Sequence, residues 1–304
     1  MNKSALFIVN KFSGGGYRPE VEGRIIEECR TACIECRIEF TRSRGHATEL
    51  ARWAVEQKMD FAFAVGGDGT VNEVAQGLVD SNVAMGILPK GSGKGLARHL
   101  AVPMDFKKSL DIVSHHEEEL IDTVLINQKL SVNVSGIGFD GHVAAMFAVK
   151  AKRGLLGYTK LVLNEFRNFK SFDASVSLNG KTFNAKPFII AIANSSQFGN
   201  NAKVAPHASV CDQLIDVSFI QKIPFTQAPA FAGKMFTGKL DSSRFVDIHK
   251  TQKLSIQLEA PVAFHIDGEA MLAADTFDAL IQPRSLRVLL PIKANSNRRG
   301  KSPI

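Results

Sequence analysis

The chain has 304 residues, of which 45% are hydrophobic and 22% are charged, a composition typical of a globular protein with one large domain or two moderate ones. No apolar run reaches the roughly 18 residues of a membrane span, and the N-terminus lacks the features of a signal peptide, so we expect a cytoplasmic protein whose membrane contact is peripheral, at the inner surface. The formal net charge of +7 favours an anionic partner, unless it reflects only a solvated basic surface.

Residues 1–122 alternate between apolar strands and amphipathic helices. Near-continuously apolar strands separated by helices are typical of a parallel sheet covered on both faces, so we predict a Rossmann-like α/β domain. The predicted strands are 5–10, 36–41, 61–65 and 83–89, and the predicted helices are 19–33, 46–57, 70–79 and 93–100.

Residues 123–293 follow a different pattern, with short strands that alternate apolar and polar residues. The pair Asn179–Gly180 between two such strands predicts a hairpin, and helices are expected at 141–168 and 225–236. This part is predicted to be a mostly antiparallel, β-sandwich-like domain, followed by a polar and basic tail at 294–304.

Four cysteines are too few for a disulfide framework, but three of them lie close together. Cys29, Cys33 and Cys36 have the C-x3-C-x2-C spacing with which radical enzymes hold an iron–sulfur cluster. Cys29 and Cys33 also continue a helical repeat that begins at Val21 and Ile25, and this favours the buried face of an amphipathic helix instead.

Three glycine-rich turns follow predicted strands: "NKFSGGG" (10–16), "VGGDGTVN" (65–72) and "LPKGSGKG" (88–95). In a parallel sheet these turns meet at one edge, where backbone amides and helix N-termini bind phosphate groups. Thr70 is expected to cap the next helix. Asp68 cannot bind phosphate directly, but it suits Mg²⁺ or a proton taken from an attacking hydroxyl. The alternative is a tight turn whose aspartate satisfies its own backbone.

The stretches "GGDGTVNEV" and "GILPKGSGKGLARHL" resemble the catalytic domain of the diacylglycerol kinase family, which includes bacterial soluble lipid kinases and sphingosine kinases. "VNKFSGG" resembles the family's first loop, with Lys11 replacing its proline. "FTRSRGHATELA" (40–51), "SGIGFDGHVA" (135–144) and "HIDGE" (265–269) also match. The GGDGT motif is shared with NAD kinases and phosphofructokinases. The matches at "SGIGFDGHVA" and "HIDGE" narrow the resemblance to lipid kinases.

The resemblance implies ATP-dependent phosphorylation of a lipid hydroxyl, with a cleft between a nucleotide domain and a lipid domain. Glu269 would be the general base, and Asp68 would lie beside the Mg²⁺–phosphate network or share the base role. Without the resemblance, Glu269 would be interpreted as part of a hairpin turn. The implied ATP-site residues are Asn10, Lys11, Phe12, Ser13, Gly14, Thr41, Gly66, Gly67, Asp68, Gly69, Thr70, Val71, Asn72 and Ser92.

The resemblance also implies a structural Mg²⁺ held by the Asp212 side chain and the carbonyls of Ser209 and Leu214, the hard oxygen ligands that this metal prefers. A simple β-turn aspartate is the alternative. Asp140 stands where sphingosine kinases bind the lipid amine, but diacylglycerol kinases have an aspartate there too, so the acceptor lipid stays open between diacylglycerol and a sphingoid base.

One loop departs from the family pattern. The usual G-T-x-N-D sequence is replaced by Gly91–Gly95, with Lys94 in place of the asparagine and Gly95 in place of the aspartate. The resemblance implies that diacylglycerol kinases use that aspartate in a Mg²⁺-linked network, which Gly95 cannot supply. Lys94 could instead neutralise ATP phosphate charge.

Residues 142–170 mix apolar side chains with lysines and arginines, among them Lys152 and Arg153. Such a stretch can rest on an anionic bilayer, or it can be a core-facing helix pair with a solvated basic face.

Three other functions remain: an NAD-kinase-like enzyme with a soluble substrate, a non-catalytic nucleotide- or lipid-binding regulator, and a nucleic-acid binder. The last rests on net charge alone, because no nucleic-acid-binding module is recognisable, so we expect no nucleic-acid partner. A homodimer is left open.

Overall fold

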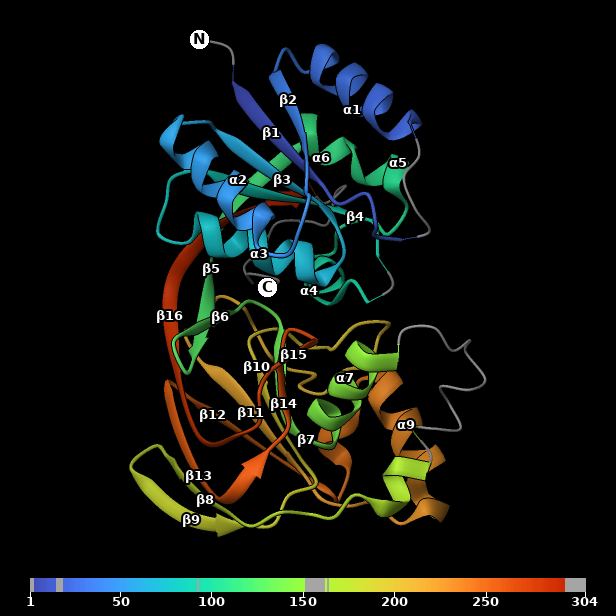
Figure 1. Ribbon diagram of the computed structural model, residues 1–304, viewed down its shortest axis with the longest axis vertical. Helices are drawn as coiled ribbons and strands as arrows, with labels where there is room; N and C mark the ends of the chain where they lie inside the picture. Colours follow the sequence, from blue (N-terminus) through green and yellow to red (C-terminus); the bar gives the residue numbers. More distant parts are fainter. Residues whose placement is uncertain (1–2, 15–18, 92, 151–161, 163, 293–304) are drawn as a thin grey trace, which may run out of the picture. The chain divides into compact units, whose positions relative to one another are not determined.

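The computed structural model of the chain describes residues 3–14, 19–91, 93–150, 162 and 164–292 (Figure 1). Two compact units are formed. The first contains the described residues of Met1–Thr123, Val210–Asp212 and Gln282–Ile304, and the second contains those of Val124–Ser209 and Gln213–Ile281. This division departs from the predicted one, 1–122 and 123–293, because the chain returns to the first unit after residue 281. The predicted tail, 294–304, lies outside the described residues.

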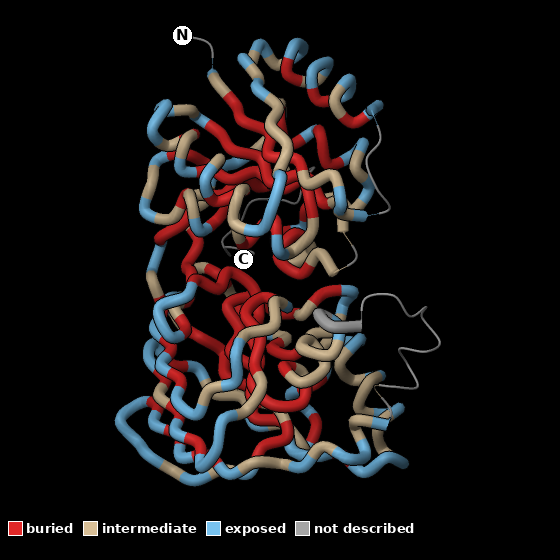
Figure 2. Tube along the Cα trace, viewed as in Figure 1, coloured by how far each residue is buried: buried red, intermediate tan, exposed pale blue. Residues whose placement is uncertain are grey.

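The first unit is built on the parallel strands β1 (Ser4–Val9), β2 (Glu35–Phe40), β3 (Phe61–Gly66) and β4 (Ala84–Pro89), in the order β2-β1-β3-β4. β3 and β4 are buried along their whole length, as expected of apolar strands covered on both faces. Figure 2 shows the buried residues of each unit concentrated along its strands. The predicted parallel α/β sheet is confirmed.

The described residues of this unit form the helices α1 (Glu20–Thr31), α2 (His46–Glu56), α3 (Asp68–Leu78), α4 (Gly95–His99), α5 (Phe106–Ser109) and α6 (Asp111–Ser114). The α3 helix begins two residues earlier than predicted, with Gly67 as its N-cap, so Thr70 lies within the first turn and is not the cap. The α4 helix starts late because Lys94 adopts a left-handed conformation, with φ 60°.

The second unit is mostly antiparallel. One sheet has the order β12-β11-β10-β7-β14-β15, and a second ladder runs β16-β13-β8-β9. The bounds of the first sheet are β7 (Val134–Gly138), β10 (Ile189–Ala193), β11 (Ile215–Ile220), β12 (Val246–Thr251), β14 (Phe264–Ile266) and β15 (Glu269–Ala270). Those of the ladder are β8 (Ala174–Leu178), β9 (Lys181–Ala185), β13 (Lys253–Val262) and β16 (Ala274–Pro291).

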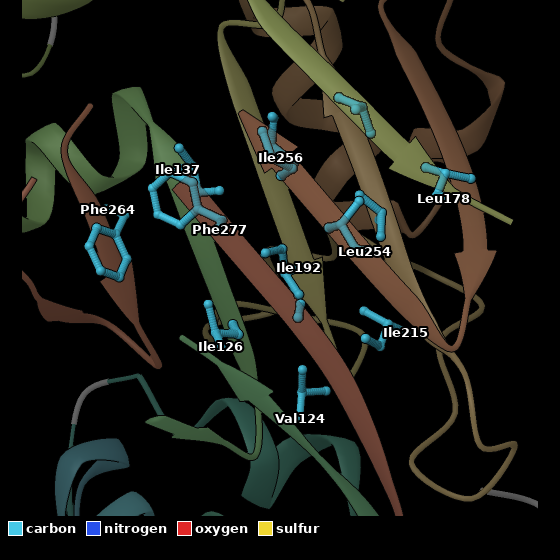
Figure 3. Close-up of a cluster of buried hydrophobic side chains, with 14 of the residues drawn as sticks. Val124, Ile126, Ile137, Leu178, Ile192, Ile215, Leu254, Ile256, Phe264 and Phe277 are labelled. Carbon is cyan, nitrogen blue, oxygen red and sulfur yellow. The ribbon is translucent and has the colours of Figure 1, made fainter. Parts of the chain in front are cut away.

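Side chains from both sheets form the core of the second unit (Figure 3). Ile137, Ile192 and Ile215 come from the six-stranded sheet, and Leu254 and Phe277 come from the ladder. All five are almost fully buried. Two sheets that bury their apolar faces against each other make a β-sandwich, so that prediction is confirmed.

The remaining elements are β5 (His116–Ile126), β6 (Lys129–Ser131), α7 (Phe139–Lys150), α9 (Ala228–Thr237) and the 3₁₀ turns η1 (Phe225–Gln227) and η2 (Leu240–Ser242). Asn179 and Gly180 connect β8 to β9 with φ 51° and 73°, which confirms the predicted hairpin.

The last part of β16 completes the first unit. Val288 pairs in parallel with Met85 of β4, and the Arg284 amide donates to the Asp122 carboxylate at 2.8 Å. The earlier part of the same strand pairs with β13. The edge of β4 that does not pair with β3 is therefore covered by the last part of β16. Short-range sequence patterns do not predict this pairing of β4 with β16.

The structure confirms the prediction of a buried helical face for Cys29 but not for Cys33. Val21, Ile25 and Cys29 form the buried face of α1, but Cys33 lies beyond the helix and is exposed, so its predicted burial is wrong. Burial, with a contribution from the adjacent Cys36, raises the pKa of the Cys29 thiol well above its usual range. Within the part of the chain that the structure describes, no group of three or more His, Cys, Asp and Glu side chains is placed to hold a metal.

Thiol labelling tests this placement. Burial, together with the nearby Glu119 carboxylate, raises the pKa of Cys211 to about 11. At pH 8 its thiolate fraction should be about 200 times smaller than in the unfolded chain, where the pKa is about 8.5. Mass spectrometry after alkylation should therefore show slow modification of Cys211 in the native protein, which speeds up as the pH approaches 11. Exposed Cys33 is the control. Equal native and unfolded rates for Cys211 would contradict its burial.

Candidate functional site

Loops at the carboxyl ends of β1 and β3, together with the segment after β2, surround a pocket of about 410 Å³ in the first unit. The structure therefore brings seven of the predicted ATP-site residues to one place. They are Asn10, Phe12, Ser13, Thr41, Gly67, Gly69 and Thr70.

The glycine-rich loops are fastened to one another beside this pocket. The Asn10 amide donates to the Thr70 hydroxyl at 3.1 Å, and the Ser13 hydroxyl donates to the Lys90 carbonyl. Gly14 has φ +61°, and a Cβ atom there would lie 2.2 Å from the Lys90 carbonyl oxygen. Only glycine permits that close approach, so the first loop can rest on the third.

The pocket wall offers a helix N-terminus and two arginines to an anion, against one carboxylate, that of Glu73. The α3 helix begins at this wall with Gly67, which has no side chain to cap the helix, and Gly67, Gly69 and Thr70 line the pocket. A helix N-terminus carries partial positive charge and amide donors suited to phosphate. Arg42 and Arg44 also line the pocket. Sequence reasoning did not assign these two arginines, although they stand next to the predicted Thr41.

Asp68 has a clear structural role in the first turn of α3. Its two carboxylate oxygens accept hydrogen bonds from the backbone amides of Lys94, at 2.8 Å, and Gly95, at 2.7 Å. The altered loop is thus held by backbone groups, which do not require the family's usual side chains. The Lys94 ammonium donates to the Met104 carbonyl at 3.2 Å and does not line the pocket, so the structure does not support its predicted contact with phosphate.

Other predicted ATP-site residues are absent from the pocket wall. The Lys11 ammonium lies 3.8 Å from the centre of the Phe40 ring. Val71 and Asn72 are buried in α3, where the Asn72 side chain accepts a hydrogen bond from Gln76 at 2.6 Å. Gly14, Gly66 and Asp68 shape the loops without lining the pocket. Ser92 lies outside the described residues. The roles of these residues with ATP stay predictions.

In the second unit, the D-G-E sequence forms the turn between β14 and β15. Asp267 and Gly268 have φ 48° and 87°, and Glu269 begins β15 with its side chain half-buried. The buried Asp267 carboxylate accepts hydrogen bonds from the Ser131 hydroxyl at 2.6 Å and from the amides of Val132, at 2.8 Å, and Asn133, at 3.1 Å. Sequence reasoning missed these hydrogen bonds, which fix the position of the turn that carries Glu269.

A second contact fixes the same turn. The Gly268 amide donates to Nδ1 of the buried His265 at 3.1 Å, so that nitrogen is an acceptor and the ring proton lies on Nε2. His265 Nε2 lies 3.4 Å from Asp140 Oδ2, and Asp140 Oδ1 accepts from the Gly141 amide at 2.8 Å. Asp140 thus lies beside the turn that carries Glu269. Its predicted contact with the acceptor lipid remains untested.

The hydrogen bonds to the Asp267 carboxylate predict a large loss of stability when this side chain is truncated. Asp267→Ala would leave two amides and one hydroxyl buried without their acceptor, and alanine disfavours a positive φ, so the free energy of unfolding should fall by about 3–5 kcal/mol. Asp267→Asn keeps one acceptor oxygen and tolerates the backbone conformation, so its loss should be smaller. Urea denaturation measures both.

Asp247→Ala is the matched control, because Asp247 is 73% exposed and its carboxylate is paired with His249 at the surface. Its effect should stay within about 0.5 kcal/mol. A stability loss for Asp267→Ala no larger than that of this control would show that the turn does not depend on the carboxylate.

The structure does not test the predicted Mg²⁺ ligands. Asp212 is assigned to the first unit, whereas Ser209 and Leu214 are assigned to the second. This metal site therefore stays a prediction. Lys152 and Arg153 of the predicted basic stretch lie outside the described residues.

The fold is an α/β unit with glycine-rich loops after its parallel strands, followed by a β-sandwich. Comparison with protein families makes this class specific. Residues 4–126 match the diacylglycerol kinase catalytic domain, and residues 133–290 match the YegS C-terminal NAD kinase beta sandwich-like domain. The chain belongs to the diacylglycerol kinase family, with a YegS-type second domain, and is a kinase of the lipid kinase class.

Curated relatives match along nearly the whole chain. The diacylglycerol kinase of Bacillus subtilis is 24% identical over 272 residues, which cover 88% of this chain and 90% of that protein. A protein of Enterobacter sp. named "Probable lipid kinase YegS-like" is 26% identical over 296 residues, which cover 94% and 96%.

A solved structure has the same fold. The crystal structure of a diacylglycerol kinase from Bacillus anthracis matches with a TM-score of 0.75 at 18% identity, covering 94% of this chain and 96% of that one. In the described residues, no helix has both the length and the apolar character needed to cross a membrane.

Proposed function

We propose that the protein transfers the γ-phosphoryl group of ATP to a hydroxyl group of a membrane lipid, either diacylglycerol or a sphingoid-type lipid. The observation that carries the proposal is the pocket beside the interlocked glycine-rich loops, with the N-terminus of α3, Arg42 and Arg44 on its wall. These groups suit the phosphates of a nucleotide. The name of the Bacillus subtilis relative supports diacylglycerol as the first acceptor to test.

In this mechanism Glu269 is the general base. Its carboxylate takes the proton from the lipid hydroxyl, and the oxygen forms a bond to the γ-phosphorus while the bond from that phosphorus to the β–γ bridging oxygen breaks. ADP leaves with the bonding electron pair. The Asp267 and His265 hydrogen bonds hold the turn, so Glu269 needs little reorganisation.

Magnesium would accompany the nucleotide and neutralise phosphate charge. Mg²⁺ usually keeps several waters and takes only one or two carboxylates, so it needs no cage of protein ligands. Asp68 fits this role, since it offers hard oxygen atoms between the two pocket-lining glycines Gly67 and Gly69. The Lys94 and Gly95 amides fix the orientation of its carboxylate.

Phosphate transfer from labelled ATP tests the proposal. The purified protein would be incubated with Mg²⁺ and with diacylglycerol, a monoacylglycerol, ceramide or sphingosine in mixed micelles, and separately with NAD. Label in the lipid phase is expected, and the labelled species identifies the acceptor. Transfer to NAD would replace the lipid substrate by a soluble one. ATP binding without transfer to any acceptor would favour a non-catalytic regulator.

A further inference from the structure

The outward face of α9 and the preceding turn η1 is apolar and carries no charge. Ile223 is buried just before this segment, and Phe231 and Met235 of α9 pack against the same cluster of buried side chains. The exposed residues are Phe225, Thr226, Pro229, Ala230, Gly233, Phe236 and Thr237. A surface helix normally turns charged or strongly polar residues toward water. This segment turns apolar side chains both inward and outward.

Two phenylalanines dominate this surface. Phe225 is 51% exposed and Phe236 is 52% exposed. Exposed large apolar side chains that gather on one face, rimmed by polar residues, mark interaction surfaces. We refer to the face formed by Phe225, Pro229, Ala230, Gly233 and Phe236 as the α9 face.

The charges around the α9 face are almost all positive. Residues 221–245 contain the cations Lys222, Lys234, Lys239 and Arg244 and a single acid, Asp241. The Asp241 carboxylate lies 3.2 Å from the His207 ring.

Two arginines contact the η1 turn directly. The Arg167 guanidinium lies 5.0 Å from the centre of the Phe225 ring, and Arg244 donates to the Gln227 side chain at 3.3 Å. Cations therefore lie beside the η1 end of the α9 face, which suits a negatively charged surface.

A pocket of about 290 Å³ adjoins this face. Its walls include the cations Lys234 and Arg244, the hydroxyl-bearing Ser242 and Ser243, and the aromatic Phe231. The Lys234 ammonium donates to the Ser242 carbonyl at 2.9 Å, which holds its charge at the pocket wall. Cations with hydroxyl groups suit an anionic head group, while the neighbouring phenylalanines suit acyl chains.

We propose that the α9 face docks on the surface of an anionic lipid bilayer, with Phe225 and Phe236 at the boundary between head groups and acyl chains. The proposal rests on the lipid kinase function, because an enzyme of that class must meet its acceptor at a membrane. Apolar insertion and attraction between basic residues and anionic lipid act together in such docking. A second copy of the chain fits less well, since two copies would bring their basic rims together.

Vesicle flotation tests the docking without using kinase activity. Binding would be measured on vesicles containing phosphatidylglycerol and on vesicles of phosphatidylcholine alone. The Phe225→Ser/Phe236→Ser double variant should bind anionic vesicles at least tenfold more weakly than the unaltered protein. The Phe236→Leu variant should bind anionic vesicles as tightly as the unaltered protein. Ile26→Ser is the matched control, because Ile26 is 52% exposed on α1, and its vesicle binding should not change.

A second pair of variants tests the charge component. Arg244→Glu should weaken binding to anionic vesicles about fivefold and reduce its salt dependence, whereas Lys181→Glu on the exposed strand β9 should have little effect. Thermal melting would verify that each variant is folded. The proposal would be overturned if the Phe225→Ser/Phe236→Ser variant and the Arg244→Glu variant were both folded and both bound anionic vesicles like the unaltered protein. It would also be overturned if the unaltered protein formed a dimer in solution that only the double variant abolished.

The two proposals fail in distinguishable ways. If the protein phosphorylates lipid in detergent micelles but the substitutions on the α9 face leave its vesicle binding unchanged, the proposed kinase function stands and the proposed docking surface is wrong. Vesicle binding that depends on Phe225 and Phe236, in a protein that phosphorylates no lipid, keeps the docking surface and removes the proposed reaction.

Discussion

Replacement of Glu269 by glutamine is expected to lower kcat by about 10³-fold, because an amide cannot take the proton from the acceptor hydroxyl. Glutamine has nearly the same size, so the pairing of β15 with β14 and the hydrogen bonds to the Asp267 carboxylate should persist. Nucleotide affinity should stay within about twofold, since the proposed role of Glu269 is with the acceptor hydroxyl and Glu269 does not line the pocket proposed for the nucleotide.

Steady-state kinetics with the lipid acceptor and calorimetric ATP titration would measure these two effects. Glu259→Gln is the matched control, because it makes the same change at an exposed position of β13. Its kinetic constants should equal those of the unaltered protein. Full turnover by Glu269→Gln would remove Glu269 from the role of general base.

Asp68→Asn should damage both nucleotide binding and turnover. Asparagine can accept only one of the two backbone hydrogen bonds that the carboxylate now accepts, and its NH₂ group would face the other amide. The segment at Lys94 and Gly95 should loosen, and the negative charge proposed to assist Mg²⁺ is lost. We expect kcat to fall at least about 100-fold and ATP affinity at least about tenfold.

The loss of this half-buried acceptor also costs stability, by about 1 kcal/mol. Asp111→Asn, at an exposed position of α6 where the carboxylate pairs with His115, provides the comparison. A thermal melt separates instability from catalytic loss. Normal ATP affinity in a folded Asp68→Asn protein would show that the two hydrogen bonds do not shape the nucleotide site.

The features that were predictable from the sequence depend on neighbouring residues. The strands of the first unit are short apolar runs, and the hairpin at Asn179–Gly180 needs only two residues that accept positive φ. The glycine-rich loops follow their strands directly, so their meeting at one edge follows from parallel pairing. The α3 helix shows the limit of such reasoning, because Thr70 was expected to be the cap and Gly67 is.

The features that were missed depend on contacts between distant residues. The Asp267 carboxylate binds amides more than 130 residues earlier in the chain, and nothing around D-G-E signals that partner. Asp68 binds the amides of Lys94 and Gly95, which could not be inferred from a loop whose usual side chains are replaced. Arg42 and Arg44 were identifiable as basic residues but not as part of the pocket wall.

The strand β16 has a consequence for biosynthesis. On one side β4 pairs with β3, and on the other it pairs with β16 through Met85 and Val288, a residue made more than 200 positions later. While the ribosome is still translating the second unit, β4 is an open edge with unpaired amide and carbonyl groups, which is a risk for aggregation. The first unit can complete its sheet only after β16 has been synthesised, so this step waits for the whole second unit although β1 to β4 emerge first.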